Sequence, residues 1–180
     1  MSGHHTRLRW CSQQRCLSTE LKAEIKSWLF DSGSLTTRLM NHCDEPFSVK
    51  VLSVVRTTPT PDEVQALKLR SRSQAIIRQV LLCCGDRPVV YARTIIPVSS
   101  LRGSLRAIVL LRNKSLGAVL FADKNMRREP MEITSLKSSH KCYSWTRYKG
   151  QELIWGRRSV FKLRNEKLLV SEFFLPGLIS

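Results

Sequence analysis

Three charged residues stand in otherwise apolar segments of the sequence: Arg78 in QAIIRQVLLC, Arg93 in PVVYARTIIP and Glu172 in LLVSEFFLP. Each segment alternates as a strand does, and successive side chains of a strand point to opposite faces of the sheet. Glu172 therefore shares a face with Val170 and Phe174. Because a buried charge is costly unless it is paired, the pattern predicts either an ion network or a site for a charged ligand.

The two arginine segments flank CGDR, which predicts a hairpin with a two-residue loop. In that register Arg78 lies directly opposite Arg93, and like charges opposite one another destabilise a sheet. Three explanations stay open. Glu172 neutralises one arginine in a structural ion network, or the arginines point outward into solvent. Alternatively, the three charges line a pocket for an anion with two carboxylates, because a planar guanidinium holds a carboxylate by two hydrogen bonds.

The composition is that of a strongly basic globular protein. The chain has 180 residues, 30 lysines and arginines against 14 acids, and a formal net charge of +16. This charge favours anionic partners: nucleic acid, an anionic membrane surface or a small anionic substrate. A stacking platform for nucleic acid needs aromatic residues among basic ones, and only YSWTRYK at 143–149 approaches that pattern. We expect no specific nucleic-acid partner and only weak electrostatic association with membranes.

Neither targeting nor metal binding is indicated. No apolar stretch near the N-terminus is long enough for a signal peptide, and the apolar run at 107–111 is too short to span a bilayer. We therefore expect a cytoplasmic protein whose six cysteines are reduced thiols. No CxxC pair occurs, and the spacing of histidines and cysteines fits no standard metal site, so we predict no metal.

The order of elements predicts an α+β fold. The expected helices lie at 18–30, 34–40, 62–69, 100–111 and 116–123, and the expected strands at 47–56, 74–83, 88–97, 131–134, 158–164 and 167–175. Most strands follow each other too closely for parallel crossovers. We predict a single antiparallel sheet of about six strands with helices packed on one face, formed by residues 18–180 after a basic N-terminal arm at 1–17.

Six blocks in this order resemble the chorismate pyruvate-lyase family: SLTTRL at 34–39, IIRQVLL at 76–82, ARTIIPVSSL at 92–101, LGAVLF at 116–121, WGRRSVF at 155–161 and LLVSEFFLP at 168–176. The likeness covers most of residues 20–176. It implies an enzyme that removes pyruvate from chorismate to give 4-hydroxybenzoate, the first committed step toward ubiquinone in many bacteria. It also implies that no metal or organic cofactor is used, and that helical flaps bury the ligand against the sheet.

The resemblance also implies roles for individual residues. Arg78 matches the arginine that holds the ring carboxylate, and Glu172 matches the acid that contacts the 4-hydroxyl group. Leu35 and Leu116 match positions whose backbone groups contact the ligand. Arg93 matches an active-site arginine, which we assign to the enolpyruvyl carboxylate. Glu172 and Arg93 are thus the predicted catalytic residues.

The sequence departs from the family pattern in two places. Residues 135–150 look like an insertion, expected to be a surface hairpin or, alternatively, a lid or partner contact. Ala92 stands where members of the family tend to have glycine, and its methyl group could tighten the pocket. One alternative function is a non-catalytic effector-binding domain of the kind found in transcription regulators, although residues 1–20 are too short for the usual DNA-binding domain. We expect a monomer.

Overall fold

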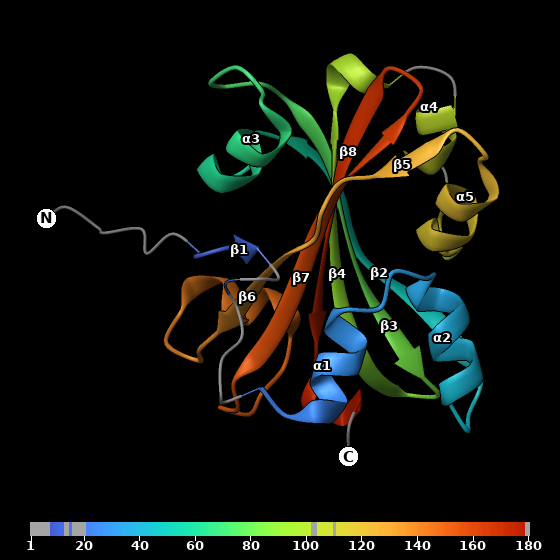
Figure 1. Cartoon of the computed structure of the whole chain (residues 1–180), viewed down its shortest axis with the longest axis vertical. Helices are drawn as coiled ribbons and strands as arrows, with labels where there is room; N and C mark the ends of the chain where they lie inside the picture. The colour runs from blue at the N-terminus through green and yellow to red at the C-terminus, as the bar shows by residue number, and fades with distance from the viewer. Residues whose placement is uncertain (1–7, 13–14, 16–20, 102–103, 110, 179–180) are drawn as a thin grey trace, which may run out of the picture.

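The protein is described by a computed structural model that covers residues 8–12, 15, 21–101, 104–109 and 111–178. Its centre is one antiparallel sheet of eight strands in the order β1-β6-β7-β8-β4-β3-β2, with β5 paired to β7 (Figure 1). The strands are β1 (Cys11–Ser12), β2 (Phe47–Thr57), β3 (Ala75–Cys84), β4 (Arg87–Pro97), β5 (Met126–Arg128), β6 (Glu132–Leu136), β7 (Ile154–Leu163) and β8 (Glu166–Phe174).

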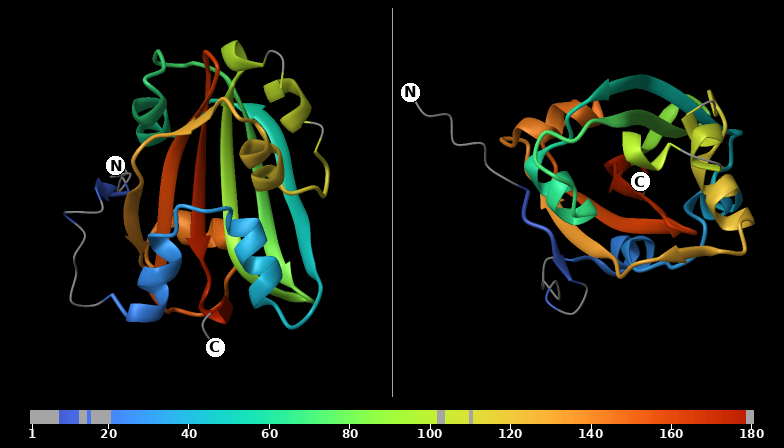
Figure 2. Two further views of the ribbon diagram at one scale, coloured as in Figure 1. Left: turned by 45° about the vertical axis from the view of Figure 1, so that its right-hand side comes forward. Right: turned by 90° about the horizontal axis from the view of Figure 1, so that it is seen from above.

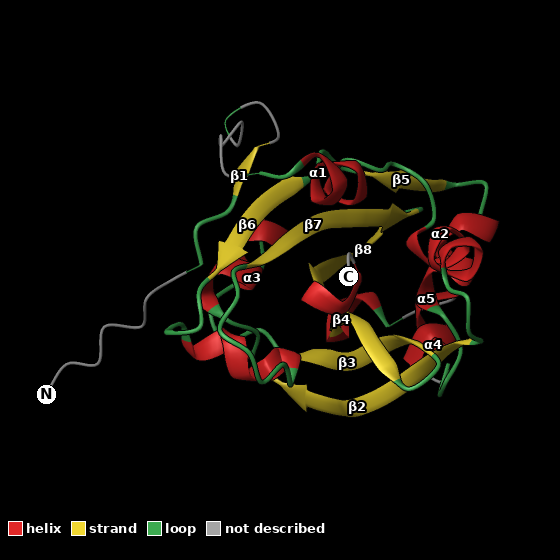
Figure 3. Ribbon diagram, turned by 90° about the horizontal axis from the view of Figure 1, so that it is seen from below, coloured by secondary structure: helices red, strands yellow, loops and turns green. Residues whose placement is uncertain are grey.

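Helices cover the sheet on both faces. They are α1 (Ala23–Leu29), α2 (Leu35–His42), α3 (Pro61–Leu67), α4 (Ser104–Val109) and α5 (Leu116–Ala122), with 3-10 helices η1 (Val98–Ser100), η2 (Lys141–Thr146) and η3 (Pro176–Leu178). In Figure 2, α1, α2 and α5 stand in front of the sheet. Figure 3 shows α2, α4 and α5 gathered on one side of the molecule and α3 on the opposite side.

The face covered by α1, α2, α4 and α5 holds two of the hydrophobic clusters. Leu29 of α1 and Leu39 of α2 are fully buried with the apolar side chains of β3, β4 and β8. Ile108 of α4 and Leu120 of α5 are buried against β7 and β8. The opposite face packs against α3 through Leu67, and against η2. The alternation along each strand therefore sorts side chains between two separately covered faces.

The predicted fold class is confirmed, because the structure is an α+β protein built on a single antiparallel sheet. The sheet has eight strands rather than about six. The two additional strands, β1 and β5, have only two and three residues, too few to show a periodic pattern. Helix α3 lies on the face opposite the other four helices.

The register between β3 and β4 corrects one prediction. The two-residue hairpin loop is present, but Arg78 pairs with Thr94 and not with Arg93. The cause is a β-bulge beside the loop, where Pro88 pairs with β3 and Val89 is skipped. Proline has no N–H to donate to the ladder and is found in sheets at edges or bulges. One extra residue moves every later side chain of β4 to the other face.

Part of the predicted N-terminal arm is structured. Cys11 and Ser12 pair with β6, and the Trp10 indole donates a hydrogen bond to Asp62 of α3 at 3.1 Å. The segment 135–150 continues from β6 into η2, whose Tyr143 is buried on the sheet face opposite α2. It covers that face and lies away from α2 and α5. Its status as an insertion stays a prediction.

Three of the described cysteines, Cys11, Cys43 and Cys84, are disulfide-bonded, which corrects the prediction of reduced thiols throughout. Cys43, which ends α2, forms a disulfide with Cys84 at the end of β3, and their Cα atoms are 5.3 Å apart. The two residues are 41 positions apart in the sequence, so only the folded arrangement brings them together. Among the helices of the described residues, none is long and apolar enough to cross a membrane.

Candidate active site

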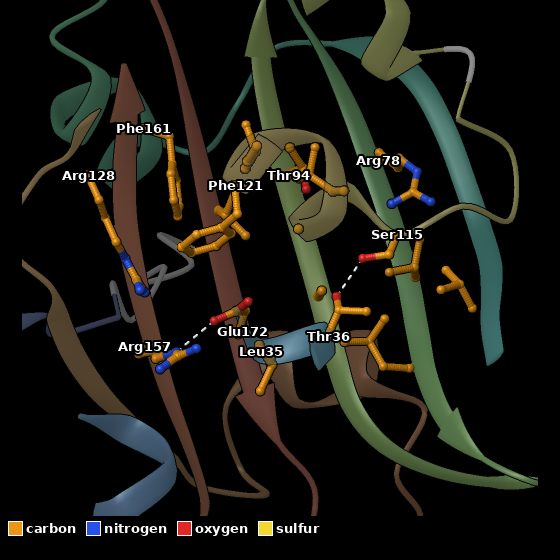
Figure 4. A pocket seen from close by; sticks show the side chains of 18 of the residues that line it. Leu35, Thr36, Arg78, Thr94, Ser115, Phe121, Arg128, Arg157, Phe161 and Glu172 are labelled. Carbon is orange, nitrogen blue, oxygen red and sulfur yellow. Dashed lines mark hydrogen bonds and ion pairs between the residues drawn. The ribbon is translucent and has the colours of Figure 1, made fainter. Parts of the chain in front are cut away.

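A cavity lies between the sheet and the helices α2 and α5. Its charged lining residues come from four strands: Arg78 of β3, Arg128 of β5, Arg157 of β7 and Glu172 of β8. Figure 4 shows Arg78 on one side of this cavity and the other three charges together on the opposite side. The sequence prediction that Arg78 and Glu172 face a common space therefore agrees with the geometry.

Arg78 is a buried cation without an acidic partner in the described part of the chain. Only 3% of the residue is exposed. Its Nη2 atom donates to the backbone carbonyls of Arg112 (2.9 Å) and Lys114 (3.1 Å), in the loop between α4 and α5. Burial lowers the pKa of the guanidinium, because desolvation disfavours the charged form. An anion in the cavity would restore the missing counter-charge.

Glu172 is held by Arg157, whose Nε donates to the Glu172 Oε2 atom at 2.6 Å. Arg157 is 1% exposed. Its Nη1 atom also donates to the backbone carbonyls of Trp28 (2.9 Å) and Asp31 (2.6 Å) at the end of α1. These bonds fix the guanidinium, and the guanidinium in turn fixes the carboxylate of Glu172 at the cavity wall.

Arg128 is the third cation of the cavity. Its Nε donates to the Ser159 hydroxyl at 3.0 Å, and its Nη1 to the backbone carbonyl of Ser32 at 3.3 Å. The guanidinium carbon lies 5.2 Å from the centre of the Phe161 ring. Burial, together with the nearby charge of Arg157, lowers the pKa of Arg128. No described acid forms an ion pair with it.

The cavity carries an excess of positive charge. Among the described residues that line it, three guanidiniums face one carboxylate, which leaves a net charge of about +2 at neutral pH. Uncompensated charge in a closed space is unfavourable, so the arrangement favours a ligand with two negative charges. In the described residues, no group of three His, Cys, Asp or Glu side chains is placed to hold a metal ion.

Leu35 and Leu116 are the first residues of α2 and α5, and both line the cavity. The backbone N–H of a first helical residue has no acceptor inside its helix, so both amides can serve a ligand. The two helices are joined by a hydrogen bond of 2.5 Å between the hydroxyls of Thr36 and Ser115. Figure 4 shows this bond at the cavity, between Arg78 and Leu35.

The closed cavity is narrow. Its volume is about 50 Å³, whereas small-molecule sites commonly measure about 300–1,000 Å³. The walls are apolar. The rings of Phe121 and Phe161 lie edge to face with their centroids 6.4 Å apart, and Ala92 lies on the sheet side. A ring-sized ligand needs more room than this volume, so we expect α2 and α5 to move apart when it binds. Their arrangement is that of flaps.

Arg93 does not line this cavity, which corrects the sequence prediction. The bulge in β4 turns its side chain to the opposite face, where its Nε donates to Glu63 of α3 at 2.7 Å and its guanidinium lies over the Trp145 ring at 4.6 Å. Burial alone would lower the pKa of Arg93, but the hydrogen bonds and charge of Glu63 raise it overall. Arg93 therefore belongs to a structural ion pair and lies on the wrong face of the sheet to contact a ligand in this cavity.

The sequence prediction missed Arg128 and Arg157. The signal for Arg157 was available, since it shares a strand face with Phe161 in WGRRSVF. Glycine at 156 hid the beginning of the strand. Gly156 is required there because a Cβ atom would lie 2.7 Å from the Phe173 ring. Arg128 lies on a three-residue strand and gave no periodic signal.

The chain is similar in sequence to one protein family and to proteins that carry the same name. The sequence model of the family described as chorismate lyase matches residues 7–180. A protein of Methylococcus capsulatus is 38% identical over 157 residues, covering 87% of this chain and 97% of its own length. One of Aromatoleum aromaticum is 40% identical over 163 residues, covering 88% of each chain. Both carry the name "Probable chorismate pyruvate-lyase".

Solved structures share the architecture at low sequence identity. The C-terminal domain of the histidine utilization repressor from Pseudomonas syringae has a TM-score of 0.53 at 9% identity, covering 73% of this chain and 93% of that one. A GntR-family transcriptional regulator from Bacillus cereus has a TM-score of 0.54 at 10% identity, covering 73% and 92%. These similarities concern the fold alone.

Proposed function

The chain belongs to the chorismate lyase family, and we propose that it eliminates pyruvate from chorismate and leaves 4-hydroxybenzoate. The observation that carries this proposal is the charge of the cavity. Chorismate is a dianion with one carboxylate on the ring and one on the enolpyruvyl ether. A cavity in which three guanidiniums face one carboxylate has a net charge of opposite sign and equal size.

The positions of the charges suggest how the ring lies. Arg78 would hold the carboxylate on C1 by a charge-assisted contact. Glu172, on the other side of the cavity (Figure 4), would accept a hydrogen bond from the hydroxyl on C4, the ring position opposite C1. Phe121 and Phe161 would form the apolar walls, and the first amides of α2 and α5 would contribute backbone contacts.

The reaction is an elimination that makes the ring aromatic. The C3–O bond breaks, and its electron pair leaves with the oxygen of enolpyruvate. The proton on C4 departs, and the electron pair of that C–H bond completes the aromatic ring. The enolate gains a proton at its methylene carbon and becomes pyruvate. One proton is lost and one is gained, so the step needs neither an oxidant nor a reductant.

The protein's contribution is orientation and electrostatics, because aromatisation supplies driving force. Glu172 lies where it can orient the 4-hydroxyl group and accept the C4 proton, directly or through water. Arg157 keeps the carboxylate of Glu172 in place. The product is an aromatic anion in a closed cavity, so we expect opening of the flaps to limit turnover.

The direct test is to incubate the purified protein with chorismate in the presence of EDTA. We expect equimolar release of 4-hydroxybenzoate and pyruvate, well above the spontaneous background. Chromatography measures the first product and a coupled assay the second. Tight binding of 4-hydroxybenzoate without release of pyruvate would instead indicate a ligand sensor with the same fold. If the protein neither releases pyruvate nor binds 4-hydroxybenzoate, the proposed site is refuted.

The carboxylate contact is tested by Arg78→Ala. Loss of a charge-assisted, bidentate contact costs about 1.5–3 kcal/mol, so the Kd for 4-hydroxybenzoate should rise about 10- to 150-fold. A matched control is Arg56→Ala, which removes an exposed arginine from β2. Unchanged product affinity in Arg78→Ala, measured by calorimetry, would exclude this role.

A further inference from the structure

With Arg93 turned to the other face, the proposed reaction requires another cation for the second carboxylate of chorismate. In chorismate the enolpyruvyl ether is on C3, next to the carbon that carries the hydroxyl group. If Arg78 holds the C1 carboxylate and Glu172 the C4 hydroxyl, the leaving group must lie at the Glu172 end of the cavity. Figure 4 shows Arg128 and Arg157 at that end, with Arg128 extending toward Glu172 from β5.

Of these two arginines, only Arg128 has its charge available. Arg157 already forms an ion pair with Glu172 and donates to two backbone carbonyls. Arg128 has two neutral acceptors, the hydroxyl of Ser159 and the carbonyl of Ser32, and no acid of the described chain pairs with it. The Phe161 ring beneath its guanidinium and the Ser159 bond hold the side chain along the cavity wall.

We propose that Arg128 binds the enolpyruvyl carboxylate of the substrate and stabilises the negative charge that develops on the departing enolate. The proposal rests on the proposed lyase function and names the residue that distinguishes substrate from product at this site. The substrate has two carboxylates and the product only one. Arg78 would therefore contribute to binding of both molecules, and Arg128 to binding of the substrate alone.

This difference makes the proposal testable by binding as well as by turnover. In Arg128→Ala, kcat/KM for chorismate should fall about 100-fold or more, the usual effect of removing a donor to developing charge. The Kd for 4-hydroxybenzoate should change less than about twofold, because no contact to the product is removed. Retained product binding also shows that the variant is folded. Arg128→Lys keeps the charge without the planar fork and should have intermediate activity.

A stable ligand provides a readout without turnover. The aromatic ether 3-(1-carboxyvinyloxy)benzoate carries both carboxylates and cannot be aromatised further. Its Kd should rise about 10- to 150-fold in Arg128→Ala, as expected for loss of a bidentate ionic contact. The matched control is Arg127→Ala, because Arg127 is the exposed neighbour on β5 and, among the described residues, donates to the carbonyls of Lys124 and Met126.

Three outcomes would overturn the assignment: kcat/KM within about fivefold of wild type, equal losses of dicarboxylate and product affinity in both Arg128 variants, or an equal effect of Arg127→Ala. Failure of the proposed function gives a different result. In that case the wild-type protein itself does not release pyruvate from chorismate, and the affinity difference between the dicarboxylate and 4-hydroxybenzoate still shows whether Arg128 reads a second carboxylate.

Discussion

The hydrogen bond between Thr36 of α2 and Ser115 before α5 is the feature on which we base our most detailed prediction. It is 2.5 Å long and joins the two helices that we expect to move apart for a ligand to pass. A hydrogen bond between neutral groups contributes about 0.5–1.5 kcal/mol net. Its loss should therefore raise the population of open flaps, and with it the rate of product release, by about 2- to 12-fold.

The two single variants should differ. In Thr36→Val, the hydroxyl left behind is that of Ser115, which is partly exposed and can bond to water. In Ser115→Ala, the hydroxyl left behind is that of Thr36, which is 8% exposed. An unsatisfied buried group costs about 1–3 kcal/mol, so Ser115→Ala should release product faster than Thr36→Val.

The assay is stopped-flow displacement of 4-hydroxybenzoate from the two single variants, the double variant and Thr37→Val, an exposed threonine on the same helix. Because one bond links Thr36 and Ser115, the double variant should be no faster than the faster single variant. If release limits turnover, kcat should rise in parallel. Multiplicative effects in the double variant, or an equal effect of Thr37→Val, would refute the interpretation of this bond as a latch.

Three further predictions concern the carboxylate, the disulfide and the sheet. Glu172→Gln retains a neutral acceptor for Arg157 but removes the base, so kcat should fall about 10²- to 10⁴-fold; full turnover would exclude proton transfer to Glu172. Loss of the bond between Cys43 and Cys84 should lower the free energy of unfolding by about 2–4 kcal/mol, and the urea midpoints of Cys43→Ser and Cys84→Ser, measured without reductant so that the disulfide at Cys11 stays intact, should fall by the same amount; midpoints equal to that of the wild type would contradict this. Gly156→Ala places a methyl group 2.7 Å from a ring and 3.2 Å from a backbone carbonyl, so its thermal midpoint should fall with a loss of about 1–3 kcal/mol; an unchanged midpoint would show that the sheet adapts.

Long elements with a strong periodicity were predictable from the sequence. The strands around Arg78 and Glu172 have the predicted faces because six or more alternating residues define a face. Helices α2 and α5 were predictable because Ser34 and Ser115 directly precede them, as capping residues do. These elements place Arg78, Glu172, Leu35 and Leu116 at the cavity.

The errors come from features that local pattern does not encode. The bulge in β4 depends on one proline beside a hairpin loop, and its effect extends along the rest of the strand. Strand β5 has three residues, and its pairing with β7 exists only in the folded sheet. The disulfide joins residues 41 positions apart. The last two depend on contacts between segments distant in the sequence, and the bulge acts at a distance because it changes the face of every later residue of β4.

The two faces of the sheet explain why Arg78 lines the cavity and Arg93 does not. A buried arginine is stable when acids compensate its charge, and on the face of α3 this condition is met. Arg93 pairs with Glu63, and Arg158 pairs with Asp62 and Glu132, so two cations meet three carboxylates. On the face of α2 and α5, three cations meet one carboxylate. A charge on an apolar strand face therefore predicts burial, whereas the balance of charges across the assembled face indicates a ligand. One strand of the sequence is enough to predict that a charge is buried. The charge balance of a face requires knowing which strands and helices meet there.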